Sequence, residues 1–297
     1  MSSLAAEPHA RHGNMTGIVA MLASMATFTI NDTCIKLLSD RVPLGEIIFL
    51  RNAAATLFIL DFAVMFGGLT LPKDAPRNLL SWRMAAEVLS TLFFLSALVR
   101  MPIADATAIA QSTPLAMTAA AAIFLKEPVG WRRWSAAIVG FLGVLLIVKP
   151  GTATFSPAAL SILVAVALVV GRDLITRLIH GSVPTLTLTL MSAASVMPAG
   201  FVLLPFETWV WPGAREVMLV LFAGLNLTAG YALIVVAMRA GDVAIIAPFR
   251  YAVILFGLIS GYVVWGQLPD AVQMLGIAIL TAAGLYTFRR ERLAHKL

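Results

Sequence analysis

The chain contains two stretches of similar sequence, DTCIKLLSDRVP at Asp32–Pro43 and DLITRLIHGSVP at Asp173–Pro184, separated by an offset of 141 residues. The first aspartate, one leucine, the valine and the last proline are identical, and Lys36 stands where the second copy has Arg177. Each copy ends a long apolar segment and has a proline just beyond it. The identity is sparse, so a chance match is the alternative. The similarity of the two stretches predicts that the chain has two related halves, with the substrate site at their junction.

The composition indicates a membrane protein. Hydrophobic residues make up 60% of the chain and charged residues 12%, too few polar groups to cover a soluble domain of this length. Several apolar runs are long enough to cross a bilayer, and they lack the alternation of a membrane barrel. Lipid offers no hydrogen-bond partners to the backbone, so the spans must be helical. We therefore expect an all-α polytopic membrane protein.

Ten transmembrane helices are predicted from the apolar runs. Their expected ranges are Met15–Leu38, Leu44–Phe66, Leu80–Val99, Ile103–Leu125, Trp131–Val148, Pro157–Ile179, Thr185–Phe206, Val217–Met238, Val243–Trp265 and Ala271–Phe288. They divide the chain into a disordered N-terminus (1–14), a five-helix repeat (15–148), a linker (149–156), a second five-helix repeat (157–288) and a basic tail (289–297). Because five is odd, the second repeat must enter the membrane upside down, which predicts two inverted repeats.

The cations predict how the chain is oriented. With ten spans both termini share one side, and that side carries thirteen cations: Arg11, Lys73, Arg77, Arg83, Lys126, Arg132, Arg133, Arg177, Arg239, Arg289, Arg290, Arg292 and Lys296. The other side carries five: Lys36, Arg41, Arg100, Lys149 and Arg215. Positive loops face the cytoplasm, so both termini are expected there, in a bacterial inner membrane. The net charge of +6 thus reflects membrane orientation, and we expect no nucleic-acid partner.

Among the charged side chains within predicted spans, we single out Asp32, Glu46, Arg51, Asp61, Glu87, Arg172, Asp173 and Arg250. A charge at the bilayer centre costs roughly 2.5–3.5 kcal/mol on insertion scales, so each should meet a partner or water. The inverted topology places Asp32 and Arg51 at similar depth towards the outside, and Asp173 and Arg250 towards the cytoplasm. We hypothesise that these are two gating ion pairs that flank a central cavity. The alternative is that they only satisfy each other between packed helices.

Two corresponding spans contain a proline. The fourth carries Gln111-Ser112-Thr113-Pro114 and the ninth Pro248-Phe249-Arg250-Tyr251. Proline removes a backbone hydrogen bond and bends a helix, and paired broken helices mark binding sites in secondary transporters. A packing kink without a ligand is the alternative. With polar residues of the third and eighth spans, the candidate substrate-binding set is Gln111, Ser112, Asn226, Tyr231, Arg250, Tyr251 and Glu87.

Other functional classes lack their motifs. No Gly-rich phosphate loop with its lysine is present, which excludes direct ATP drive. The four histidines lie in tails or loops, so we expect no metal site, no cofactor and no catalytic residues. The single cysteine, Cys34, excludes an internal disulfide. An integral membrane enzyme is a remote alternative.

Two runs of the sequence resemble a known transporter module. The first, at 104–148, is ADATAIAQSTPLAMTAAAAIFLKEPVGWRRWSAAIVGFLGVLLIV, and the second, at 247–271, is APFRYAVILFGLISGYVVWGQLPDA. They resemble the EamA-type module of the drug/metabolite transporter superfamily, which has a proline in its fourth span, a glutamate soon after, here Glu127, and a Gly-rich fifth span. The second half departs from this pattern with Gln267, which puts in doubt any scheme that needs both carboxylates.

The resemblance implies ten helices in two inverted repeats and carriage of small metabolites by alternating access. It also implies a likeness to aromatic amino-acid exporters of the YddG kind. We expect a monomeric secondary carrier that exports amino acids or similar amphipathic compounds, with a small-molecule substrate and the lipid bilayer as its partners. Uptake of a vitamin or an S-adenosylmethionine-like metabolite is the alternative. Protons as a coupling ion and simple facilitated diffusion are both allowed.

Overall fold

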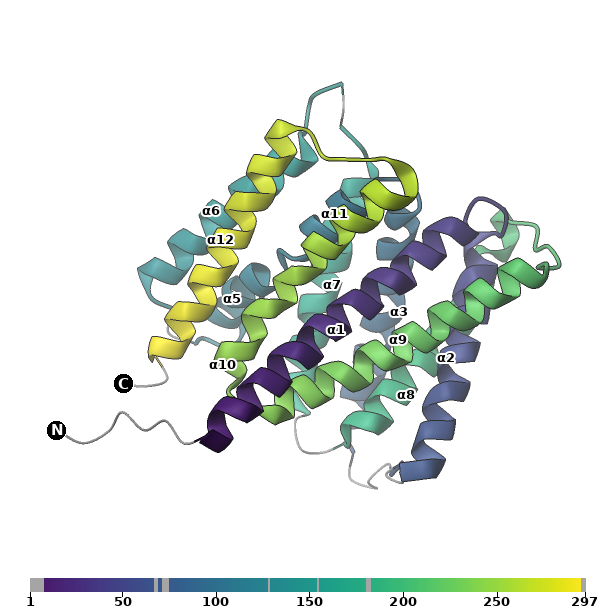
Figure 1. Ribbon diagram of the computed structural model, residues 1–297, viewed down its shortest axis with the longest axis horizontal. Helices are drawn as coiled ribbons and strands as arrows, with labels where there is room; N and C mark the ends of the chain where they lie inside the picture. Colours follow the sequence, from purple (N-terminus) through teal and green to yellow (C-terminus); the bar gives the residue numbers. More distant parts are fainter. Residues whose placement is uncertain are drawn as a thin grey trace.

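The computed structural model describes residues 8–66, 69–70, 75–127, 129–153, 155–179 and 183–294. Within this part of the chain every regular element is a helix, and ten helices or consecutive helix segments are long and apolar enough to cross a membrane (Figure 1). The predicted all-α polytopic membrane fold is thereby confirmed.

The helices follow the predicted spans closely. The first half contains α1 (Pro8–Leu38), α2 (Leu44–Phe66), α3 (Arg77–Leu98), α4 (Ile103–Ala110), α5 (Thr113–Phe124) and α6 (Trp131–Val148). The second half contains α7 (Ala158–Leu178), α8 (Thr185–Val196), the 3-10 segment η1 (Met197–Phe206), α9 (Ala214–Ala240), α10 (Val243–Ile246), the 3-10 segment η2 (Ala247–Tyr251), α11 (Ala252–Trp265) and α12 (Ala271–Ala294).

Three spans are broken into segments. The fourth divides between α4 and α5 at Gln111–Ser112, and the ninth passes from α10 through η2 to α11, so both expected breaks lie at their prolines. A third break, between α8 and η1, was not foreseen. It coincides with Pro198, and Pro205 follows within the same 3-10 segment.

The chain ends are more helical than expected. Helix α1 begins at Pro8 rather than at the expected Met15, and residues 1–7 lie outside the described part. The Asn14 side chain accepts a hydrogen bond from the backbone N–H of Asp242, at 2.8 Å, and this contact holds the beginning of α1 against the end of α9. At the other end, α12 continues through the basic tail to Ala294, where Arg290 donates to the Tyr286 hydroxyl one turn earlier.

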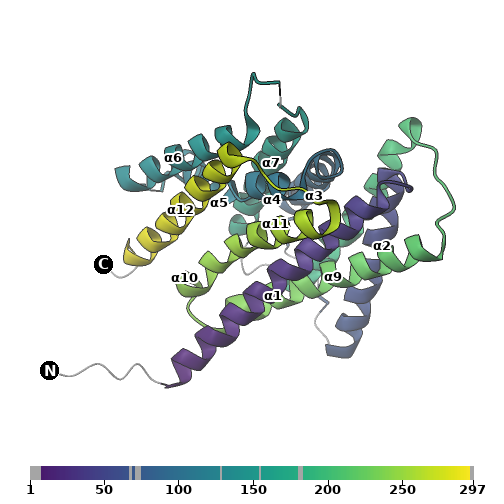
Figure 2. The same ribbon diagram turned by 45° about the horizontal axis from the view of Figure 1, so that its top comes forward.

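The packing of the helices is reciprocal between the halves. Helix α1 runs along α9, and α3 runs along α7, and both pairs lie side by side in Figures 1 and 2. Exchanging the halves converts the first pair into the second. The same exchange leaves α6 packed on α12, and α2 packed on α8 and η1. The five-span units are thus related by a pseudo-twofold axis, and their odd number makes them run in opposite directions through the membrane.

Glycines allow the helices to approach closely in the two contacts that the exchange of halves leaves unchanged, α6 with α12 and α2 with η1. A Cβ atom on Gly143 of α6 would lie 2.8 Å from the carbonyl oxygen of Gly276 on α12. A Cβ on Gly45 of α2 would lie 2.5 Å from the carbonyl oxygen of Gly200 in η1. Helix association in lipid depends on such close backbone packing, because apolar side chains gain little by leaving an apolar solvent.

The apolar side chains divide between a lipid-facing surface and a core. Many large hydrophobic residues are exposed, as expected of a surface that faces acyl chains: Leu142, Phe206, Phe222, Leu255 and Val263 are examples. The main core cluster fills the end of the molecule where α1 ends, α2 begins and α3 ends. It includes Ile35, Leu38, Ile47, Leu98 and Ile103. This end of the interface between the halves is therefore solidly packed.

Candidate substrate-binding site

Two adjoining cavities lie between the halves, with volumes of about 240 and 610 Å³. They share four lining residues, Glu87, Arg172, Ser192 and Tyr231, and therefore form one continuous site. The smaller, which we call the inner cavity, lies deep between α1, α2, α3, α7, α8 and α9. The larger extends towards the end where α3 begins and where α7 and α9 end. The site is thus closed at the packed end and continues towards the other.

The inner cavity lies on the pseudo-twofold axis. Five pairs of its lining residues are separated by the same offset of 141 that relates the two sequence stretches: Phe28/Val169, Asn31/Arg172, Arg51/Ser192, Asn52/Ala193 and Ser90/Tyr231. Each pair contributes one residue from each half. A site on such an axis is where rocking of one half against the other changes access from side to side.

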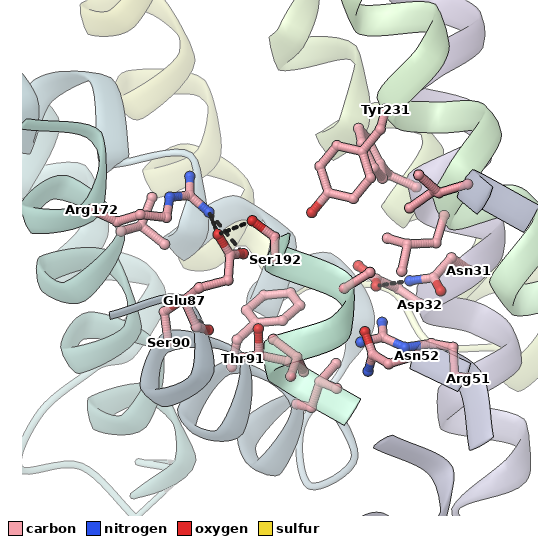
Figure 3. A pocket seen from close by; sticks show the side chains of 18 residues that line it. Asn31, Asp32, Arg51, Asn52, Glu87, Ser90, Thr91, Arg172, Ser192 and Tyr231 are labelled. Atoms are coloured by element: carbon pink, nitrogen blue, oxygen red, sulfur yellow. Dashed lines mark hydrogen bonds and ion pairs between the residues drawn. The ribbon is translucent and has the colours of Figure 1, made fainter. Parts of the chain in front are cut away.

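One wall of the inner cavity carries a cluster of charges in which Glu87 is buried and Arg172 is partly exposed (Figure 3). Nη1 of Arg172 on α7 lies 3.2 and 3.3 Å from the two carboxylate oxygens of Glu87 on α3. The same guanidinium reaches Asp173, with Nη2 2.8 Å from Oδ1. The Ser192 hydroxyl on α8 donates to Glu87 at 3.3 Å. Three helices are thereby joined at the depth of the cavity.

Arg83 completes this cluster from the next turn of α3. Its Nη1 donates to the Ser192 hydroxyl at 2.9 Å, and its Nε donates to the Thr176 hydroxyl at 3.0 Å. Its Nη2 lies 3.8 Å from the Glu87 carboxylate. The two guanidiniums, Arg83 and Arg172, are therefore matched by the two carboxylates, Glu87 and Asp173. Pairing of this kind is what permits charges to reside within a membrane span.

The opposite wall comes from α1, α2 and α9. The Asn31 side chain donates to the Asp32 carboxylate at 2.9 Å, and Arg51 lies beside them in Figure 3. Tyr231 from α9 packs edge-on against Phe28, with ring centroids 5.4 Å apart. This wall thus combines charged groups with an aromatic surface, which suits an amphipathic ligand.

Two of the four proposed gating residues, Asp32 and Arg51, line this site, and the four pair differently from the hypothesis. Asp32 and Arg51 both line the inner cavity, although no ion pair within 4.0 Å joins them. Asp173 is bound by Arg172, its neighbour on α7, and the described residues contain no ion pair between Asp173 and Arg250. Arg172, rather than Arg250, is the ion-pair partner of Asp173, because the Arg172 guanidinium lies beside both Glu87 and Asp173. Arg250 belongs to the separate segment η2.

The proposed substrate-binding residues divide into two groups. Glu87 and Tyr231 line both cavities. The four residues of the broken helices line neither and instead join η2 to the break between α4 and α5. Gln111 Nε2 donates to the carbonyl oxygen of Arg250 at 3.0 Å, and the Tyr251 hydroxyl donates to the carbonyl oxygen of Gln111 at 3.4 Å. Ser112 is fully buried and donates to the Ile109 carbonyl.

Asn226 also lies outside both cavities. It is buried, and its side chain donates to the carbonyl oxygen of Phe222 one turn earlier on α9, at 2.8 Å. Several residues of the inner cavity were not singled out from the sequence as ligand contacts, among them Phe28, Asn31, Asn52, Arg172 and Ser192. The 141-residue offset was the signal that would have found them, because it places Asn31 opposite Arg172 and Arg51 opposite Ser192.

Comparison with known proteins assigns the first half to a family. Residues 15–149 match the model of the EamA-like transporter family. This half of the chain is similar to an EamA-like transporter domain. The resemblance noted in the sequence is thereby confirmed, and the drug/metabolite transporter superfamily is supported.

Relatives of known function match almost the whole chain. The S-adenosylmethionine uptake transporter of Rickettsia prowazekii (strain Madrid E) is 26% identical over 94% of each chain. The riboflavin transporter of Rhizobium johnstonii is 26% identical over 98% of this chain and 95% of the relative. The pseudopaline exporter CntI of Pseudomonas aeruginosa (strain UCBPP-PA14) is 26% identical over 93% and 96%. The EamA domain and these matches support a bacterial multi-pass membrane transporter.

The fold also matches a solved structure. One crystal structure superposes with a TM-score of 0.64, covering 94% of this chain and 97% of the other, at 20% sequence identity. Similarity at this level of identity shows a shared fold, and leaves the substrate to be argued from the site.

Proposed function

We propose that the chain is a secondary transporter of small amphipathic metabolites that carry an amino-acid group, working by alternating access in a bacterial inner membrane. The observation that carries this proposal is the inner cavity on the pseudo-twofold axis. It presents carboxylates, guanidiniums and aromatic rings together in one cavity. Charges of both signs suit a zwitterion, and the ring of Tyr231 beside Phe28 suits its apolar part.

Alternating access would rock the two five-span units about this axis. The apolar cluster around Leu38, Ile47 and Leu98 closes the site at one end in the present conformation. The larger cavity continues at the end that holds the beginning of α1. With both termini in the cytoplasm, as the cation distribution favours, the site faces inwards and would receive its substrate there for export. Amino acids are the first substrate class we propose for this direction.

Uptake of an adenosylated or vitamin-like metabolite is the second candidate. Relatives named as S-adenosylmethionine uptake and riboflavin transporters, matched over 94% and 98% of this chain, favour it. S-adenosylmethionine is itself an amino acid with a large aromatic substituent, so it would place the same zwitterionic group in the inner cavity, whereas riboflavin carries no such group.

Counterflow in vesicles tests the proposal. Purified protein reconstituted in liposomes would be loaded with one unlabelled compound and exposed to its labelled form, using L-phenylalanine, L-methionine, S-adenosylmethionine and riboflavin in turn. We expect accumulation of at least one of the three amino acids. An imposed pH gradient of either sign distinguishes proton coupling from facilitated diffusion. Protein that is folded by circular dichroism and moves none of the four compounds would refute the proposed function.

A further inference from the structure

The three arginines that line the inner end of the site differ in their partners. Arg83 and Arg172 are bound to carboxylates and hydroxyls within the cluster around Glu87. The guanidinium of Arg51 has no hydrogen bond or ion pair with any described residue. Arg51 is only 5% exposed, and its Nε is buried without a partner. Figure 3 shows its guanidinium at the inner cavity, with no interaction drawn to it.

An acceptor beside Arg51 is also unsatisfied. Oδ1 of Asn31 is buried and accepts no hydrogen bond, while the Nδ2 of the same side chain is used on Asp32. The Asp32 carboxylate in turn has this amide as its partner rather than Arg51. The inner cavity therefore contains a free cationic donor on α2 and, on α1, a free amide oxygen next to a carboxylate.

Leaving a buried guanidinium without a hydrogen-bonded anion is costly, because its charge loses water while the neighbouring carboxylate of Asp32 lies beyond ion-pair distance. Neutral groups on the same helix do not compensate it: the neighbouring Asn52 uses its amide on the carbonyl oxygen of Ile48, at 2.7 Å. The cost is removed when an anion enters. A carboxylate matches the planar fork of a guanidinium through two parallel hydrogen bonds.

We infer that Arg51 is the receptor for the substrate's carboxylate, and that Asn31 and Asp32 receive its ammonium group. The inference rests on the proposed transport function and assigns its substrate contacts. A monoanionic carboxylate fits better than a phosphate dianion, because one guanidinium is free and Asp32 and Glu87 line the same cavity. The apolar part of the substrate would then lie towards Phe28 and Tyr231.

Only the first half of the chain supplies this receptor, because the positions related to it by the pseudo-twofold axis carry different residues. The position 141 residues after Arg51 is Ser192, whose hydroxyl already donates to Glu87. The position 141 residues after Asn31 is Arg172, which is bound to two acids. The second half therefore offers no equivalent free cation in the inner cavity. A zwitterion would bind with its head on the α1–α2 wall in one orientation.

Competition between amino acids and their methyl esters tests the inference. Esterification removes the carboxylate charge and keeps the ammonium group. The reporter is whichever labelled compound the wild-type protein carries in the vesicle assay, and the competitors are L-phenylalanine and L-methionine with their methyl esters. We expect each acid to inhibit wild-type transport at least about tenfold more strongly than its ester, the equivalent of about 1.4 kcal/mol for a charge-assisted pair.

In the variant Arg51→Gln, each acid and its methyl ester should inhibit transport about equally, so the ratio of their inhibition should fall to near one. Arg51→Lys keeps the charge without the fork and should give an intermediate ratio. Arg41→Gln is the matched control, because Arg41 is an exposed arginine at the packed end, and it should retain the wild-type ratio.

Each outcome separates the inference from the proposed function. Absence of any wild-type transport refutes the function itself. Transport in which acid and ester compete equally, or in which neither competes, overturns the carboxylate receptor while leaving a transporter. That wild-type ratio is decisive even if Arg51→Gln does not fold. An Arg51→Gln protein that folds and keeps the tenfold preference for the acid also overturns it.

Discussion

The two similar sequence stretches have different environments in the folded protein. Lys36, in the first, donates from Nζ to the carbonyl oxygens of Leu98, at 2.9 Å, and Met101, and it lies 5.7 Å from the ring centroid of Trp265. It thus binds the carboxyl end of α3, where a cation is favourable. Arg177, at the matching position of the second stretch, is exposed and pairs with Glu127 at 3.4 Å.

This difference shows how a duplicated sequence supports an asymmetric state. The end that holds Lys36 is filled by the apolar cluster, and the end that holds Arg177 adjoins the larger cavity. At the closed end, the cation Lys36 therefore binds the end of a helix. At the end where the site continues, the corresponding cation Arg177 pairs only with the exposed Glu127. Exchange of these two environments is a natural consequence of rocking about a pseudo-twofold axis.

The largest effect is expected from making the walls of the inner cavity alike. Arg172→Asn gives the second half the residue that the first half has at Asn31. It leaves Glu87 with Arg83 at 3.8 Å as its ion-pair partner. Removing one member of a buried pair costs about 3–5 kcal/mol, so we expect a markedly lower Tm in detergent. An unchanged Tm would show that the cluster does not stabilise the fold. Glu127→Gln, which alters an exposed pair, is the control and should change Tm little.

A second effect should appear at the closed end. Lys36→Met removes the hydrogen bonds to the carboxyl end of α3, worth about 1–3 kcal/mol for a charged donor, and should shift the population towards opening by roughly tenfold. Cys34, the single cysteine, is buried two residues before Lys36 on α1. Its rate of maleimide labelling should rise accordingly.

The matched variant is Arg177→Met, which removes the cation at the corresponding position of the second half. It should leave labelling of Cys34 at the wild-type rate or below it. Equal rates in the two variants would show that Lys36 does not hold this end closed.

The third prediction compares two glycines at the same offset. A Cβ on Gly143 would meet backbone atoms of α12, at 2.8 Å from the Gly276 carbonyl oxygen. A Cβ on Gly284 would meet the hydroxyl end of the Tyr251 side chain, which can rotate. Overpacking costs about 1–3 kcal/mol where the neighbours cannot move. Gly143→Ala should therefore lower the Tm more than Gly284→Ala, and the reverse order would contradict rigid packing of α6 on α12.

The smallest effect concerns an exposed pair that joins the halves. Lys149, after α6, pairs with Asp270 before α12, and its ammonium group lowers the pKa of the Asp270 carboxyl. A lowered folded-state pKa stabilises the fold above the unfolded value of about 3.9 and loses this contribution as the pH falls through the folded pKa. Asp270→Asn should lower the Tm slightly at pH 7, and this difference should shrink as the pH falls below the unfolded value towards the lowered folded pKa. A Tm difference that is the same at pH 7 and in strong acid would exclude the ionised carboxylate as its cause.

Much of the fold was accessible from the sequence because the cost of placing a residue in lipid is local. The apolar runs predicted ten spans, and Pro114 and Pro248 predicted two of the broken helices. The break at Pro198 was missed, since a proline inside an apolar run does not reveal whether neighbouring groups compensate for the lost hydrogen bond. The beginning of α1 was missed for a related reason: the contact of Asn14 with Asp242 joins residues far apart in the chain.

The candidate site was accessible only in part. That charges within spans must have partners follows from composition and depth, so Glu87, Asp32 and Arg51 could be selected from the sequence. Their partners depend on how each helix is rotated about its axis, which hydropathy does not specify. For this reason Asp173 was matched with Arg250 rather than Arg172, and Gln111 and Tyr251 were expected in a cavity although they pack against each other.

The sequence by itself determined that the chain is helical and has ten segments able to cross the membrane, because solvation by lipid acts on each segment separately, and it indicated a repeat after 141 residues. Only the tertiary structure decided which helices enclose the cavity, which end is closed and which arginine has no partner. These features depend on side chains from distant segments meeting at one depth, and their energies exist only once the halves have packed together.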